Sequence, residues 1–181
     1  FRSKILAFGA SNSKSSINHQ FACYVAQQFP NPKDVNCIEI RDYPLPVYSI
    51  DLEQEEGIPI NAIAFHEKIM DSDLIVISLA EHNGTYTAGF KNLLDWMSRH
   101  QSKTFENKHF LLLSTSPGGR GGRGVMDAAL TRFPIHGAKI LNHFCLPFFE
   151  KNFNETNGII DPELSDQFRV VLREVIDKVR I

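Results

Sequence analysis

The chain has 181 residues, of which 43% are hydrophobic and 22% are charged, and its formal net charge is −2 at pH 7. These values are typical of globular proteins, and the length suits one domain over residues 1–181. The small negative charge argues against a nucleic-acid-binding protein, which usually carries a basic face. No apolar run approaches the roughly 18 residues that a membrane span needs. We therefore expect neither a nucleic-acid nor a membrane partner.

Three cysteines are present, Cys23, Cys37 and Cys145, and none has the spacing of a CxxC or Cys/His metal site. We interpret them as small buried side chains in a reducing compartment, where disulfides are rare. The N-terminal stretch FRSKILAFGAS has too short an apolar run for a signal peptide. The sequence therefore predicts a cytoplasmic protein.

Apolar stretches and helical repeats alternate along the chain. We predict strands at 4–9, 35–40, 73–79, 109–115 and 139–147, and helices at 17–29, 59–69, 88–99, from residue 125 onward and from residue 162 to the C-terminus. Asp161 is the predicted N-cap of the last helix, with Pro162 in its first position. The Pro-containing stretch DYPLPVYSID is a predicted loop, and the acidic run Glu53, Glu55 and Glu56 is a predicted solvated surface.

Five strands alternating with five helices indicate βαβ units, and hence an α/β three-layer sandwich with a parallel sheet between helices. Two open strand orders compete for a domain of this size, the flavodoxin-like order 2-1-3-4-5 and the Rossmann type. The unusual loops follow predicted strands 1, 3 and 4, which are neighbours in the flavodoxin-like order. We therefore predict the flavodoxin-like order, with a ligand at the carboxyl edge of these three strands.

The first of these loops is GASNSKSSIN, from Gly9 to Asn18, and it opens directly onto a helix. Its serine hydroxyls and the free N–H groups of a helix N-terminus together suit a phosphate. The loop lacks the glycine–lysine pattern of a Walker nucleotide site and the G-x-G-x-x-G of a Rossmann dinucleotide site. The alternative is that the serines only cap the helix and turn the chain.

The second loop, AEHNGTYTAGFKNLLDW from Ala80, follows the most apolar strand, and the third, SPGGRGGRG, starts at Ser116. Backbone groups of the second loop could contact the edge of a flat heterocycle, and four glycines in the third allow close approach of the main chain. The alternatives are an ordinary Asn83-Gly84 turn and a flexible glycine turn. Three such loops at one edge together predict a phosphate-bearing cofactor.

In detail, all three loops resemble those of the NAD(P)H-dependent FMN reductases, a flavodoxin-like family that includes quinone, azo-dye and chromate reductases. The family's first loop reads roughly G-S-x-R-x-x-S-x-N, against A-S-N-S-K-S-S-I-N here. Its second reads P-E-Y-N-x-S-x-x-G-x-L-K-N-x-x-D-W, against A-E-H-N-G-T-Y-T-A-G-F-K-N-L-L-D-W. Its third reads S-x-G-x-x-G-G, against S-P-G-G-R-G-G. The stretches RDYPLPVYSID and NGIIDPEL also resemble the family.

The resemblance implies a set of cofactor-binding residues. For the FMN phosphate these are Ser11, Ser13, Ser16, Ile17 and Asn18; for the flavin ring they are Glu81, His82, Asn83 and Gly84, mainly through backbone groups, with Ser116, Gly118 and Gly119 from the third loop.

Three departures from the family pattern stand in these loops. Ser13 stands where the family commonly has Arg, which removes a bidentate phosphate partner. His82 replaces the usual Tyr, and Ala80 replaces Pro. The resemblance therefore leaves open how tightly FMN binds, with Lys14 or an arginine from elsewhere as possible compensation.

The resemblance implies an NAD(P)H-dependent oxidoreductase that passes hydride through FMN to a quinone-like or other small acceptor with ping-pong kinetics. It also implies a homodimer or homotetramer, and the helix bearing Trp96 is one candidate subunit surface. No side chain is assigned as catalytic, and no metal is expected. The alternatives are a flavodoxin-like electron carrier, which is usually strongly acidic, and a non-catalytic binding or regulatory module. The phenylalanines at 148, 149 and 153 are either core or interface.

Overall fold

A five-stranded parallel sheet in the order β2-β1-β3-β6-β7 forms the centre of the molecule in the computed structural model, which describes residues 3–30 and 32–179. The strands are β1 (Lys4–Gly9), β2 (Asp34–Cys37), β3 (Leu74–Leu79), β6 (His109–Thr115) and β7 (Lys139–Leu146). All four pairings are parallel. Because β6 and β7 are the fourth and fifth predicted strands, the flavodoxin-like order 2-1-3-4-5 is confirmed.

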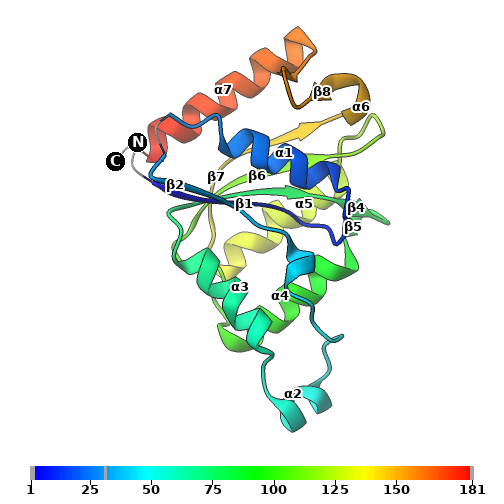
Figure 1. The fold of residues 1–181 in the computed structure, drawn as a ribbon, viewed down its shortest axis with the longest axis vertical. Coiled ribbons are helices and arrows are strands. Elements are labelled where there is room, and N and C mark those ends of the chain that lie inside the picture. Colours follow the sequence, from blue (N-terminus) through cyan, green and yellow to red (C-terminus); the bar gives the residue numbers. More distant parts are fainter. Residues whose placement is uncertain (1–2, 31, 180–181) are drawn as a thin grey trace.

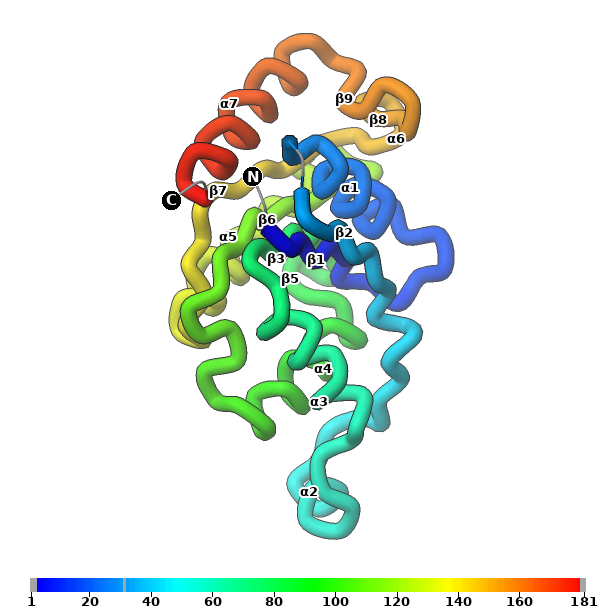
Figure 2. Tube along the Cα trace, turned by 60° about the vertical axis from the view of Figure 1, so that its left-hand side comes forward, coloured from blue at the N-terminus to red at the C-terminus, as the bar shows by residue number. Residues whose placement is uncertain are grey.

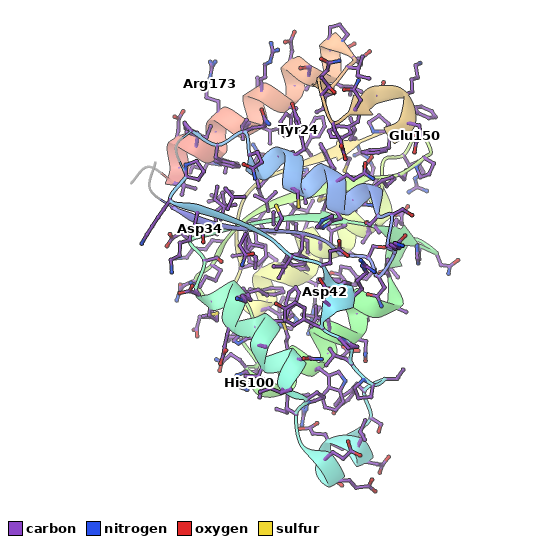
Figure 3. All side chains as sticks on the ribbon, viewed as in Figure 1. Tyr24, Asp34, Asp42, His100, Glu150 and Arg173 are labelled. Carbon is purple, nitrogen blue, oxygen red and sulfur yellow. The ribbon has the colours of Figure 1, made fainter. Side chains whose placement is uncertain are left out.

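Helices cover both faces of the sheet (Figure 1). One face carries α1 (Ile17–Ala26) and α7 (Pro162–Val179), and the other carries α3 (Ile60–Met70), α4 (Ala88–His100) and α5 (Arg123–Arg132). Strand β1 shows why the sheet needs both layers, because Ile5 packs into the cluster under α1 while Leu6 packs into the opposite one. Side chains fill the space between sheet and helices on both faces (Figure 3).

Several short elements connect these layers. They are the 3-10 turns η1 (Ile40–Asp42) and η2 (Phe133–His136), the helices α2 (Ile50–Glu56) and α6 (Phe149–Asn152), and the hairpins β4 (Glu81–His82) with β5 (Thr85–Tyr86) and β8 (Phe153–Asn154) with β9 (Gly158–Ile159). Helix α2 projects away from the sheet beyond α3 and α4 (Figures 1 and 2). Within the described ranges, every helix is too short or too polar to cross a membrane.

Some predicted boundaries differ from the structure. Helix α1 ends at Ala26 rather than at residue 29, and β2 ends at Cys37 because a 3-10 turn begins at Ile40. Helix α2 was not predicted, since prolines obscure its start, although Ser49 caps it by accepting a hydrogen bond from Leu52 N at 3.1 Å. The last helix begins at Pro162 as predicted.

Two predictions about surface residues need correction. Glu53 was expected in a solvated acidic run, but it accepts hydrogen bonds from Arg99 Nε at 2.8 Å and from the Tyr48 hydroxyl at 2.9 Å. Glu55 and Glu56 are exposed, as predicted. Cys37 was expected to be buried, but it lies exposed on an edge strand.

The aromatic residues considered for a subunit interface are mostly core. Trp96 is fully buried and donates a hydrogen bond from Nε1 to Pro46 O at 2.8 Å, so its side chain is not available for a subunit contact. Phe149 and Phe153 are buried and stacked with their ring centroids 4.9 Å apart. Phe148 remains 49% exposed.

Two buried histidines meet beside Thr104 on the α3–α4 side of the sheet. His66 donates from Nε2 to Thr104 O at 3.0 Å, while His136 approaches Ser102 O with Nδ1 at 3.2 Å and accepts a hydrogen bond from Arg132 Nε at 3.2 Å. Burial is the largest cause that lowers the pKa of both imidazoles below the ordinary histidine value of 6.5. Both rings are therefore neutral in the folded protein at neutral pH.

These histidines predict a loss of stability in mild acid. Below pH 6.5 the histidines of the unfolded chain bind protons that the buried histidines of the folded chain do not bind. The contribution of the two histidines to the free energy of unfolding is therefore complete above pH 6.5 and declines below it. We expect the free energy of unfolding to fall as the pH drops below 6.5. Urea unfolding between pH 7 and pH 5 measures this, and His66→Gln, whose amide can still donate to Thr104 O, should reduce the slope. The exposed His143→Gln is the control, and an equal slope in both variants would contradict the assignment.

Candidate functional site

The three predicted loops meet at the carboxyl edge of β1, β3 and β6. They surround a solvent-open pocket with a cavity volume of about 190 Å³. The lining consists of Ser11, Ser13, Ser15, Ser16, Ile17, Asn18, Ala80, Glu81, His82, Thr115, Ser116 and Pro117. The three loops meet because β1, β3 and β6 are neighbours in the sheet, as the predicted strand order implies.

The N-terminus of α1 faces this pocket. Ser16 caps the helix by accepting a hydrogen bond from His19 N at 3.1 Å. Within the described residues, the backbone N–H groups of Ile17 and Asn18 donate to no acceptor. Gly9 allows the tight turn from strand to helix, because a Cβ there would lie 2.4 Å from His19 N. Two free N–H groups at the positive end of a helix form a site for an anion.

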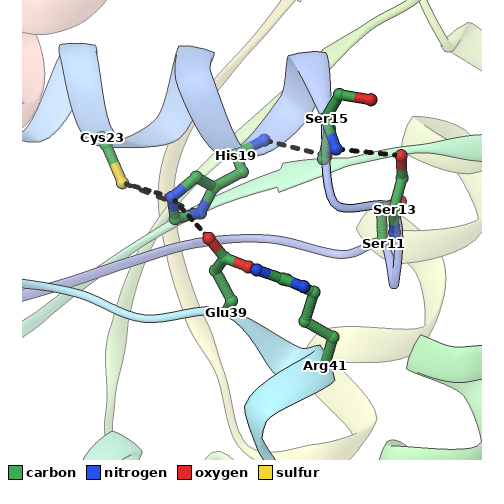
Figure 4. A network of polar contacts seen from close by, with 8 residues as sticks. Ser11, Ser13, Ser15, His19, Cys23, Glu39 and Arg41 are labelled. Carbon is green, nitrogen blue, oxygen red and sulfur yellow. Dashed lines mark hydrogen bonds and ion pairs between the residues drawn. The ribbon is translucent and has the colours of Figure 1, made fainter.

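Serine hydroxyls shape the loop in front of this helix (Figure 4). Ser13 N donates to Ser11 Oγ at 3.1 Å, and Ser15 N donates to Ser13 Oγ at 3.3 Å. Each of these hydroxyls accepts from the backbone and therefore keeps its own hydrogen for a ligand. Among the described residues that line the pocket, none is Lys or Arg, and Lys14 is not part of the lining. An anion here would be held by neutral donors and the helix dipole.

The side chain of Asn18 bonds to both neighbouring strands. It is 3% exposed, its Nδ2 donates to Thr115 O at 3.2 Å, and its Oδ1 accepts from Ser78 Oγ at 2.7 Å and from Thr115 N at 3.1 Å. These bonds join the first turn of α1 to the ends of β3 and β6. The side-chain oxygen is therefore fully occupied within the protein, and the backbone N–H of Asn18 has no acceptor among the described residues and is free for a ligand.

The second loop is the β4–β5 hairpin. Asn83 and Gly84 have φ values of 52° and 82°, which identifies a two-residue turn of type I′ and confirms the predicted turn pair. Their N–H groups have no acceptor within the described part of the chain. Thr87 follows the hairpin, caps α4 and donates from its hydroxyl to Ala10 O at 2.9 Å. This bond fixes the hairpin against the first loop.

Glu81 connects the second loop to α5. Its Oε1 accepts a hydrogen bond from Val125 N at 2.7 Å, in the first turn of that helix. Gly124 makes room for this contact, since a Cβ there would lie 2.3 Å from Glu81 Oε1 and 2.9 Å from Gly84 O. The carboxylate thus satisfies a helix N-terminus rather than pointing freely into the pocket. No local pattern predicts this bond, because its partners are separated by 44 residues.

The glycines of the third loop serve mainly the protein's own packing. Gly121 and Gly122 have φ values of 58° and 81°, and Gly122 precedes α5 as its N-cap. A Cβ on Gly119 would lie 2.8 Å from the ring of Phe148, whereas a Cβ on Gly118 would make only an ordinary contact of 3.9 Å with Ser116 Oγ. Of these four glycines, only Gly118 is therefore left to allow close approach to a planar ligand. The predicted role of the glycine run applies to this one position.

The pocket lining contains eight of the twelve predicted site residues. Asn83 and Gly84, at the hairpin tip, and Gly118 and Gly119, in the third loop, lie outside the lining. The lining also contains residues that were not assigned to the site, namely Ser15, Ala80, Thr115 and Pro117. Each of these is adjacent in sequence to a predicted residue, so the prediction missed single neighbouring positions within the same loops.

The Glu81 contact predicts a measurable link between hairpin and helix. We expect Glu81→Ala to lower the free energy of unfolding by about 1 kcal/mol, as for the loss of a helix cap. Amide exchange at Val125 and in the hairpin should accelerate, while Glu81→Gln, which keeps an acceptor oxygen, should recover part of the protection. Asp127→Ala removes an exposed carboxylate from the same helix and is the control. Equal effects of the two alanine variants would contradict the link.

Comparison with known proteins agrees with this arrangement. A family model described as NADPH-dependent FMN reductase matches residues 3–151. A quinone reductase of Escherichia coli (strain K12) is 33% identical over 120 residues, which cover 66% of this chain and 63% of that protein. The match thus spans less than two thirds of that relative. The NADH:(hydroxy)cinnamate reductase subunit CrdA of Vibrio ruber is 27% identical, with 96% of this chain and 88% of that protein covered.

Solved structures show the same fold. The flavoenzyme NAD(P)H:(acceptor) oxidoreductase FerB of Paracoccus denitrificans superposes with a TM-score of 0.79 at 17% identity, covering 98% of this chain and 97% of that one. The family model spans well over half of the sequence and includes all three loops of the pocket. The chain therefore belongs to the NADPH-dependent FMN reductase family.

Proposed function

We propose that the pocket binds FMN and that the protein is an NAD(P)H-dependent oxidoreductase for a small acceptor. The observation that carries the proposal is the free N-terminus of α1, which faces serine hydroxyls in a pocket next to the two other loops. This donor set suits a phosphate monoester. Membership of the family supports FMN as its bearer.

The residues present fit the two ends of FMN. The N–H groups of Ile17 and Asn18 and the hydroxyls of Ser11, Ser13 and Ser16 would hold the phosphate. The ring would lie against Ala80–Gly84 and Ser116–Gly119, where unpaired backbone N–H groups can donate to its oxygen and nitrogen atoms. Bound flavin supplies the hydride chemistry, so the protein's part is to bind, orient and leave one side of the ring accessible.

The relatives suggest the partners of the reaction. We propose NADPH or NADH as the reductant and a quinone-like or other small acceptor, since one relative is named a quinone reductase and another an NADH:(hydroxy)cinnamate reductase subunit. One accessible site serves both substrates in turn, which predicts ping-pong kinetics. A homodimer or homotetramer in the cytoplasm is part of the same proposal, and the three free cysteines fit a reducing compartment.

A spectroscopic titration with FMN and riboflavin tests the site. The wild-type protein should bind FMN at least about tenfold more tightly than riboflavin, because only FMN has a phosphate for the charge-assisted bonds. Anaerobic addition of NADPH should then bleach the bound flavin. Protein that binds neither flavin would contradict the proposed cofactor, and bound flavin that NADPH does not bleach would favour an electron carrier.

Ser16→Asp is the matched variant for this titration. Asp caps helices as well as Ser does, so α1 should remain folded while a negative charge enters the pocket. We expect the preference for FMN to disappear and riboflavin binding to persist, whereas Ser16→Thr should keep the preference. An unchanged preference in Ser16→Asp would place the phosphate elsewhere.

The absence of a cation from the lining predicts that FMN binding can be improved. Ser13→Arg restores the residue that the family commonly has and supplies a bidentate partner for phosphate. We expect FMN affinity to rise about tenfold and to become more sensitive to salt, with no change for riboflavin. Ser13→Gln, which adds length without charge, is the control. Equal gains for both flavins would contradict a phosphate contact.

A further inference from the structure

Two of the three cysteines lie together on the face of the sheet that α1 covers. Val35 and Cys37 are two residues apart on β2 and therefore project to the same face, and Val35 packs into the cluster under α1. Cys23, on α1, packs against that same cluster. Glu39, two residues after Cys37, approaches the imidazole of His19, one helical turn before Cys23, at 3.8 Å. Cys23 and Cys37 therefore face one another between α1 and β2. The helix and the edge strand thus bring together two thiols that are 14 positions apart.

The surroundings of the two thiols differ. Cys37 is exposed at the sheet edge, while Cys23 is partly buried. The His19 ring lies one helical turn before Cys23, with Nε2 at 3.7 Å from Cys23 Sγ (Figure 4). An accessible thiol, a second thiol beside it and an imidazole next to the second therefore form one cluster.

Exposure assigns different roles to the two thiols. Cys37 is exposed and Cys23 is partly buried, so a peroxide reaches the sulfur of Cys37 first. The neighbouring Cys23 lowers the pKa of Cys37, which favours the thiolate, the reactive form of cysteine.

We propose that Cys23 and Cys37 are an oxidation site, in which a hydroperoxide converts the adjacent thiols to a disulfide between α1 and β2. In the first step the Cys37 thiolate attacks a peroxide oxygen, which forms the sulfenic acid of Cys37 and releases hydroxide or alkoxide. In the second step the Cys23 sulfur attacks the sulfenic sulfur, the S–S bond forms, and the hydroxyl leaves as water with the proton of Cys23. His19 is placed to take the proton from Cys23 and to pass it to the leaving hydroxyl.

The reaction balances as two thiols oxidised by one peroxide, which is reduced to two molecules of water or to water and an alcohol. A disulfide here would fasten α1 to the edge strand. Because the first turn of α1 lines the pocket, the cross-link would hold the anion-binding end of the helix in place. Cys145, on β7, packs against the opposite cluster and provides an internal control.

Thiol counting on the full-length protein tests the proposal without any flavin, so its outcome does not depend on the proposed function. The protein is treated with hydrogen peroxide, remaining thiols are alkylated, and peptides are analysed by mass spectrometry. We expect free thiols to fall from three to one, with Cys23 linked to Cys37 and Cys145 alkylated, and dithiothreitol should reverse the change.

Three variants sharpen the result. Cys145→Ser should leave the cross-link unchanged. Cys37→Ser, at an exposed position, should abolish rapid thiol loss, and Cys23→Ser should stop the reaction at a sulfenic acid on Cys37 that dimedone traps. Links that involve Cys145, links between two molecules, or oxidation of Cys23 and Cys37 to separate sulfinic acids would overturn the proposal.

Discussion

The candidate site depends on one buried amide. Asn18 lies in the first turn of α1, yet its side chain is bonded to Ser78 at the end of β3 and to Thr115 at the end of β6. A buried amide whose oxygen accepts two hydrogen bonds and whose nitrogen donates a third favours one arrangement, because a displacement would leave buried polar atoms unsatisfied. The position of the helix N-terminus relative to the other two loops therefore follows from this residue.

The other loops are attached in the same manner, through side chains that bond to distant backbone. Thr87 bonds to Ala10 O and joins the hairpin to the first loop, while Glu81 bonds to Val125 N and joins it to α5. The side chains of Asn18, Thr87 and Glu81 are thus occupied with holding the loops. What remains available to a ligand is chiefly backbone N–H groups and serine hydroxyls, a donor set that suits a phosphate and the rim of a flat ring better than it suits acid–base catalysis.

Sequence patterns predicted the central strand β3 because it is apolar on both faces, and such a run is typical of a strand between two helical layers. They also located the loops, since the order of βα units places them at one edge. They could not reveal the contact of Glu81 with α5, or that Gly119 makes room for Phe148, because both depend on which segments meet after folding. Exposure of Cys37 was equally hidden, since a cysteine is usually buried and only its place at the sheet edge decides otherwise.

The groups that face an anion in this pocket are held rigidly but carry no full positive charge. An arginine at the position of Ser13 would add a full positive charge, whereas this chain offers two N–H groups at a helix end, equivalent to roughly half a charge, together with hydroxyls. Such a site stabilises a phosphate less strongly, but the helix end is already fixed by Asn18 and requires no ordering of a long side chain. The energetic cost of binding is correspondingly low, so a moderate attraction can suffice. A rigid, weakly charged site of this kind favours ligands that exchange readily over ligands that are held permanently.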